Sequence, residues 1–138
     1  MKGIDLKSLQ NKAKRVLKDL GCLDRELTLL LTDDKTIQQY HQQYLGSSKP
    51  TNVMAFPPSF RGDDVLGDVI VSIETAQREA KEAGVRLEER LVYLMIHAVL
   101  HLLGYDHDRP GAKTLKMRKM ERRLFRHVKG SAKALRSF

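Results

Sequence analysis

The feature that most constrains the fold is a long apolar segment whose second half carries histidines. Residues 86–103 have the composition of a helix, and almost every residue from 91 to 100 is apolar (LVYLMIHAVL). A helix that is apolar around most of its circumference is buried among other elements. The remaining helices and strands must therefore pack around this segment, and its polar residues need a specific reason to be there.

Three of the five histidines lie within this segment or just after it, at positions 97, 101 and 107. His97 and His101 are four residues apart, so both side chains lie on one face of a helix. Gly104 favours the end of the helix, after which His107 can turn back toward the same point. A lone histidine on an apolar face is usually a core residue, but three at this spacing, with Asp106 as a candidate hydrogen-bond partner, fit a catalytic zinc site with one open position. We therefore predict that His97, His101 and His107 bind one Zn²⁺ ion.

The spacing of these histidines equals that of the metzincin protease motif H-E-x-x-H-x-x-G-x-x-H. Ala98 stands where those proteases have the glutamate that acts as a general base. Because alanine cannot accept a proton, the sequence predicts a zinc hydrolase that does not cleave peptides. Beyond the water bound to the metal, the catalytic groups are not identified by this motif.

The chain of 138 residues has the length of one domain. We predict a single catalytic domain over residues 1–128 and a basic tail over residues 129–138. The single cysteine, Cys22, rules out an internal disulfide, which suits a reducing cytoplasm. Neither a transmembrane segment nor a signal peptide is expected.

The positive charge is concentrated after the histidines. Residues 108–138 contain 11 Lys and Arg against 2 Asp and Glu, whereas residues 1–107 contain 14 against 15. A basic helix beside a metal site predicts a polyanionic partner, most simply nucleic acid. The sparse aromatic residues exclude a base-stacking platform, so phosphate contacts are expected. The candidate residues for binding nucleic acid are Lys113, Lys116, Arg118, Lys119, Arg122, Arg123 and Arg126.

Helices and strands alternate irregularly along the chain, which predicts an α+β domain with a small mixed sheet and about five helices. Gly67 and Asp68 predict a bulge inside the last strand. Asp33 and Asp34 are expected to cap the second helix. The predicted helices cover residues 5–20, 33–45, 74–83, 86–103 and 112–128, and the predicted strands cover residues 26–32, 51–56 and 65–73.

Other polar groups are weaker candidates. The acidic residues Asp63, Asp64 and Asp68 lie close together in sequence and are minor candidates for a base or a metal ligand. His41, on a polar helix, needs no function by itself. No glycine-rich phosphate loop and no G-x-S-x-G motif is present.

Three segments together resemble the YbeY family of bacterial rRNA-maturation endoribonucleases (UPF0054-type metalloproteins). They are the histidine motif H-x-x-x-H-L-x-G-Y-D-H over residues 97–107, PTNVMAFP over residues 50–57 and LGDVIVSIETA over residues 66–76. The order and spacing of the segments also fit the family, and the resemblance covers roughly residues 30–125.

The resemblance implies a zinc-dependent, single-strand-specific endoribonuclease. Its implied roles are 16S rRNA 3′-end maturation and ribosome quality control in the cytoplasm, with the 16S rRNA precursor and the ribosome as partners. It further implies a mixed four-stranded sheet and a metalloprotease-like (zincin-like) helix carrying the metal ligands. The sequence departs from the family pattern at Ala98, where glycine is usual. It also departs at His41, where asparagine is common, and at Leu45, where many members have an arginine thought to engage RNA.

An alternative from a different functional class is a non-catalytic zinc protein that acts as a ribosome assembly factor. The departure at Leu45 favours this alternative, and a turnover assay separates the two. A metallopeptidase rests on the H-x-x-x-H spacing alone, and Ala98 argues against it.

Overall fold

The structure, a computed structural model, describes residues 4–45, 51–58, 64–104 and 112–129. Five helices and three strands form an α+β domain, as predicted, and most element boundaries agree with the predicted ones within two residues. The elements in chain order are α1 (Leu6–Asp19), β1 (Glu26–Thr32), α2 (Asp34–Leu45), β2 (Val53–Phe56), β3 (Val65–Ser72), α3 (Ile73–Ala83), α4 (Leu87–Leu102) and α5 (Ala112–Lys129).

The sheet is mixed and has the strand order β1-β3-β2. The central strand β3 pairs parallel with β1 and antiparallel with β2. The described residues form three strands, whereas the family resemblance implied four. Only three segments of this sequence have a strand pattern, and each of them forms a strand, so the sequence itself contained no signal for a fourth.

The predicted bulge lies at the start of β3. Glu26 of β1 pairs with Val65, and the next residue, Leu27, pairs with Gly67, so Leu66 has no partner of its own in β1. The extra residue and the positive φ of Gly67 (148°) are the features expected of a bulge. The backbone conformation at residue 67 therefore explains why the LGDVIVSIETA segment has a glycine there.

Gly67 also allows a close approach between β3, β2 and α4. A Cβ atom at this position would lie 2.6 Å from the carbonyl oxygen of Phe56 and 2.9 Å from a methyl carbon of Leu102. The approach to the backbone oxygen of Phe56 is not compatible with a side chain at residue 67, whereas the methyl group of Leu102 lies at the end of a flexible side chain and can move. The absence of a side chain at residue 67 therefore allows β2 to lie close to β3.

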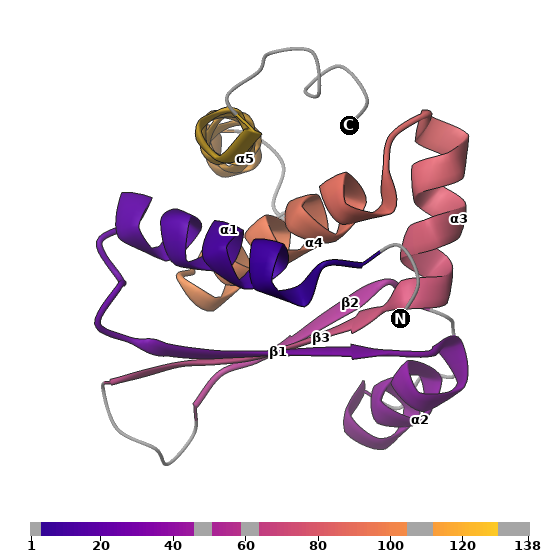
Figure 1. Ribbon diagram of the computed structural model, residues 1–138. Coiled ribbons are helices and arrows are strands. Elements are labelled where there is room, and N and C mark those ends of the chain that lie inside the picture. Colours follow the sequence, from indigo (N-terminus) through magenta and orange to yellow (C-terminus); the bar gives the residue numbers. More distant parts are fainter. Residues whose placement is uncertain (1–3, 46–50, 59–63, 105–111, 130–138) are drawn as a thin grey trace.

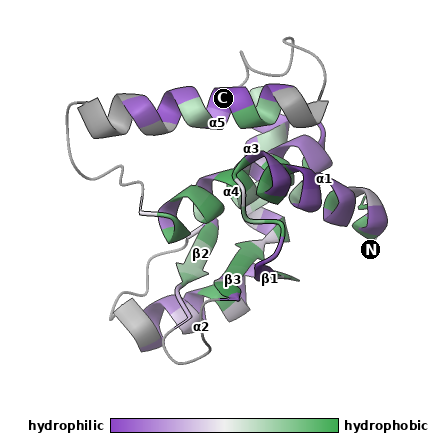
Figure 2. Cartoon of the chain, turned by 90° about the vertical axis from the view of Figure 1, so that its left-hand side faces the viewer, coloured by the Kyte–Doolittle hydropathy of each residue, from purple (hydrophilic) through white to green (hydrophobic). Residues whose placement is uncertain are grey.

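The helices cover both faces of the sheet. In Figure 1, α1 and α4 lie above the sheet, α2 lies below it, and α5 lies beyond α1 and α4. The main core includes buried residues of α1, β3, α4 and α5. A smaller core of Ile37, Met54 and Ile70 joins α2 to the opposite face. Hydrophobic residues are concentrated in α4 and the strands, whereas α1 and α5 are mostly hydrophilic (Figure 2). Within the described part of the chain, none of the helices has the length and apolar character of a membrane span.

Two adjacent aspartates fix the start of α2, as predicted. Asp33 caps the helix by accepting a hydrogen bond from a backbone N–H one turn later. The Asp34 carboxylate accepts hydrogen bonds from the hydroxyls of Ser72 and Thr75 and from the guanidinium of Arg78. These contacts, that of Ser72 first, lower the pKa of Asp34 to about 2. These hydrogen bonds join the start of α2 to the start of α3. Their position matters for the site because His41 of α2 lines the same cavity as His97 and His101.

Candidate metal centre

The histidines occupy the open side of an otherwise buried helix. Eight side chains of α4 are buried and belong to the main core: Leu91, Val92, Leu94, Met95, Ile96, Ala98, Val99 and Leu100. Arg90, Tyr93, His97 and His101 follow one another at intervals of three or four residues and keep some exposure. This spacing places their side chains along one stripe of the helix surface. The packing of α4 thus fixes the direction in which both histidines point.

His97 and His101 direct the same ring nitrogen toward each other. Their Nε2 atoms are 3.1 Å apart, and their ring centroids are 4.6 Å apart. Two nitrogen ligands bound about 2.0 Å from a tetrahedral zinc ion are about 3.3 Å apart. The Nε2–Nε2 distance therefore fits two ligands of one ion.

The third predicted ligand, His107, lies outside the described residues, as does Asp106. No other His, Cys, Asp or Glu of the described residues completes a metal site with the pair. The described chain thus supplies two imidazoles with ligand spacing.

A buried carboxylate lies behind His97. Glu121 of α5 places Oε1 3.4 Å from Nδ1 of His97, and the Glu121 side chain is only 4% exposed. The hydroxyl of Tyr93 forms a hydrogen bond with the same carboxylate. Burial, together with the charge of Glu121, raises the pKa of Tyr93 to about 12. The phenol therefore stays protonated at neutral pH and donates its hydrogen to Glu121.

The histidine pair opens into a cavity of about 590 Å³ between α4, α2 and β2. One wall is the segment from Thr51 to Pro57, which includes all of β2, and His41 of α2 also lines the cavity. Nδ1 of His41 is buried and has no hydrogen-bond partner among the described residues. The PTNVMAFP segment thus lies beside the histidine motif, although residues 58–96 separate them in sequence.

A polar network ties this wall to α4. The amide of Asn52 donates to the carboxylate of Glu79 at 3.1 Å, and Arg90 donates to Glu79 at 3.0 Å. The guanidinium of Arg90 in turn lies 4.8 Å from the ring centroid of Tyr93. The residues beside His97 are therefore connected to β2 and α3 as well as to α5.

The minor acidic candidates do not join this cavity in the described part of the chain. Asp64 lies before β3 and is exposed, and Asp68 lies within β3. Neither side chain lines the histidine cavity. Asp63 lies outside the described residues.

The candidate nucleic-acid-binding residues whose side chains the structure describes are on the open face of α5. Six of them are exposed, whereas Glu121, Leu124 and Phe125 are buried against the core. The side chain of Lys113 is not among those described. The exposed residues are Lys116, Arg118, Lys119, Arg122, Arg123 and Arg126.

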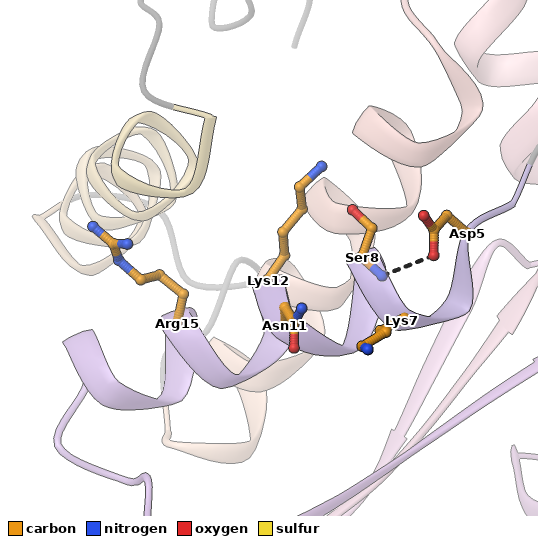
Figure 3. A pocket seen from close by; sticks show the side chains of 6 residues that line it. All are labelled: Asp5, Lys7, Ser8, Asn11, Lys12 and Arg15. Atoms are coloured by element: carbon orange, nitrogen blue, oxygen red, sulfur yellow. Dashed lines mark hydrogen bonds between the residues drawn. The ribbon is translucent and has the colours of Figure 1, made fainter.

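A second, smaller cleft of about 430 Å³ lies along α1 (Figure 3). Its six lining residues are all polar, and they include Lys7, Lys12 and Arg15. Lys12 forms an ion pair with Glu88 of α4. The cleft has no histidine or cysteine in its lining, so it is separate from the histidine cavity.

Two functional candidates were not predicted from the sequence. Glu121 is the one charged residue that is buried among the described residues, and it is the only acidic residue in a strongly basic helix. Its sequence position next to Met120 and three residues before Leu124 would have placed it on the inner face. His41 lies four residues after the fully buried Ile37, so the same spacing argument would have placed it near the sheet.

A family model described as Endoribonuclease YbeY matches residues 2–129. The chain belongs to this family. The chain is 48% identical over 112 residues to the Endoribonuclease YbeY of Syntrophotalea carbinolica, covering 77% of this chain and 74% of the relative. It is 43% identical over 129 residues to that of Geobacter sulfurreducens, covering 88% and 85%.

The fold agrees with a solved structure as well. The solution structure of TM1509 from Thermotoga maritima superposes with a TM-score of 0.68 and 27% sequence identity. The match covers 96% of this chain and 86% of the other. The resemblance noted from the three segments is thus confirmed by similarity over most of the chain.

Proposed function

We propose that this protein is a zinc-dependent endoribonuclease that cleaves single-stranded RNA in the maturation of the 16S rRNA 3′ end and in ribosome quality control. Membership of the Endoribonuclease YbeY family establishes the class of enzyme and makes RNA the substrate. The observation that carries the metal is the 3.1 Å distance between Nε2 of His97 and Nε2 of His101 at a cavity wall. Action on the ribosome in the cytoplasm is part of the proposal.

In this proposal His97, His101 and His107 hold one zinc ion on a zincin-like helix and leave one position open. A bound zinc ion supplies Lewis acidity to a phosphodiester and lowers the pKa of water toward 7. Ala98 lines the cavity beside the histidines and cannot take a proton, which suits a reaction without a carboxylate base. The cavity, bounded by β2 and His41, is where the RNA strand enters.

We further propose that the exposed face of α5 holds the RNA backbone. Six cationic side chains on one helix attract phosphates without regard to sequence. α5 is tied to the metal site directly, because its buried face reaches His97 through Glu121. Residues 1–128 then act as one catalytic domain, followed by a basic tail over residues 129–138.

Removal of metal tests the proposed activity. A single-stranded fragment of an rRNA precursor and the same fragment in a duplex are incubated with the protein, before and after treatment with a chelator. We expect cleavage of the single strand only, loss of cleavage on chelation and recovery on addition of zinc. Cleavage that resists chelation would refute the dependence on metal. Binding of zinc and RNA without any cleavage would instead favour a ribosome assembly factor.

Neutralising two exposed arginines of α5 tests the RNA path. Arg122→Gln together with Arg126→Gln should weaken binding of a single-stranded RNA roughly tenfold at low salt. The slope of log K against log salt should also become smaller by about 1, since fewer counterions are released. Fluorescence anisotropy with chelated protein measures binding without cleavage. Lys35→Gln together with Lys81→Gln, on α2 and α3, changes the net charge equally and should leave binding nearly unchanged. Equal effects of both pairs would mean that only net charge matters.

A further inference from the structure

Glu121 is in an unfavourable position unless it has a specific role. Its side chain is 4% exposed, and burial of a carboxylate costs free energy that only charged or hydrogen-bonding partners offset. Two such partners are on the opposite helix, α4: the imidazole of His97 and the hydroxyl of Tyr93. Glu121 is the single acidic residue of the basic helix α5, and it points inward to these two groups. We therefore look for its role at the proposed metal site.

The two nitrogens of the His97 ring face different neighbours. Nδ1 lies 3.4 Å from the carboxylate oxygen of Glu121, whereas Nε2 lies 3.1 Å from Nε2 of His101. A hydrogen on Nδ1 that points to a carboxylate leaves the lone pair on Nε2, which is the form that binds a metal. The same contact limits rotation of the ring.

We infer that Glu121 is a positioning residue that holds His97 in the tautomer and orientation needed for metal binding. Tyr93 holds the carboxylate in turn, because its hydroxyl donates to Glu121 and its ring lies against that of His97 at 6.5 Å between centroids. The metal site thus extends from α4 to α5. This inference rests on the proposed function in one respect, namely that the histidine pair binds zinc.

The test compares zinc affinities of purified, metal-free proteins. Glu121→Gln keeps the size of the side chain and removes its charge, so the dissociation constant for Zn²⁺ should rise roughly 10- to 100-fold. Glu121→Asp keeps the charge at a shorter reach and should restore part of the affinity. Competition with a coloured zinc chelator measures the constants, and the visible absorption of the Co²⁺-loaded proteins reports the coordination geometry.

A purely structural role makes the opposite prediction. In that case Glu121→Gln would alter the unfolding midpoint of the metal-free protein and leave its zinc affinity and Co²⁺ spectrum unchanged, and this result would overturn the inference. Tyr93→Phe serves as a second variant if Glu121→Gln does not fold, because it removes one hydrogen bond to the carboxylate and keeps the ring. It should weaken zinc binding by a smaller factor, and wild-type affinity in a folded Tyr93→Phe protein would contradict the inference.

The result also separates the inference from the proposed function. If the wild-type protein binds zinc and the His101→Ala protein does not, the proposed metal site is supported. A wild-type zinc affinity of the Glu121→Gln protein would then contradict only the role of Glu121. If the wild-type protein does not bind zinc, both fail together.

Discussion

His101→Ala is expected to abolish both metal binding and RNA cleavage. The substitution removes one of the two Nε2 atoms that lie 3.1 Å apart, and His101 is exposed, so the core of α4 remains intact. Loss of the metal removes several kcal/mol of transition-state stabilisation, which corresponds to a rate decrease of roughly a thousandfold or more. Metal analysis of the purified variant and the single-stranded RNA assay measure the two effects.

His41→Ala is the matched control for this variant. It removes an imidazole from the same cavity, but His41 is not one of the three proposed ligands, so the metal content should stay at the wild-type level. Circular dichroism checks that both variants keep their helices. Undiminished cleavage by a metal-free His101→Ala protein would show that the histidine pair has no part in the reaction.

Gly67→Ala is expected to destabilise the protein by about 3 kcal/mol. Part of this cost is the positive φ of 148°, and the rest is the clash of Cβ with the carbonyl oxygen of Phe56 and with Leu102. The melting temperature should fall by roughly 10 °C. The carbonyl oxygen of Phe56 belongs to the backbone of β2, so the main cost arises between β3 and β2, whereas the methyl groups of Leu102 can move by side-chain rotation.

Gly84→Ala separates the two contributions. Gly84 ends α3 with a φ of 72°, and a Cβ atom there would meet nothing within 4 Å. Only the backbone cost of about 1 kcal/mol is therefore expected. Thermal unfolding of both variants provides the comparison. Equal losses of stability would mean that the close approach of β2 and α4 to Gly67 contributes nothing.

The helical part of the site could be predicted from the sequence because it depends on local spacing. His97 and His101 are one turn apart on a helix whose other faces are apolar, and no tertiary information is needed to bring them together. The bulge at Gly67 was predictable for the same reason, since a glycine inside a strand pattern marks a break in the pairing.

The remaining parts of the site depend on contacts between distant segments. Glu121 reaches His97 only because α5 folds back over α4, and β2 reaches the cavity only because it pairs with β3. A single sequence does not encode such pairings in its periodicity. The spacing of Glu121 from Met120 and Leu124 indicated an inward direction, but it could not name the residue that the carboxylate would meet. The three strands of the described residues likewise follow the strand patterns of this chain, and the fourth strand that the family resemblance implied is not among them.

The deep burial of α4 has a consequence for how the protein would acquire the proposed zinc ion. Zinc fingers need their ion to fold at all, whereas here eight buried apolar side chains hold in place the helix that carries two of the proposed ligands. The protein should therefore fold before the ion binds. A shortage of zinc would then leave protein that is folded but inactive. Addition of zinc after chelation should therefore restore cleavage without refolding.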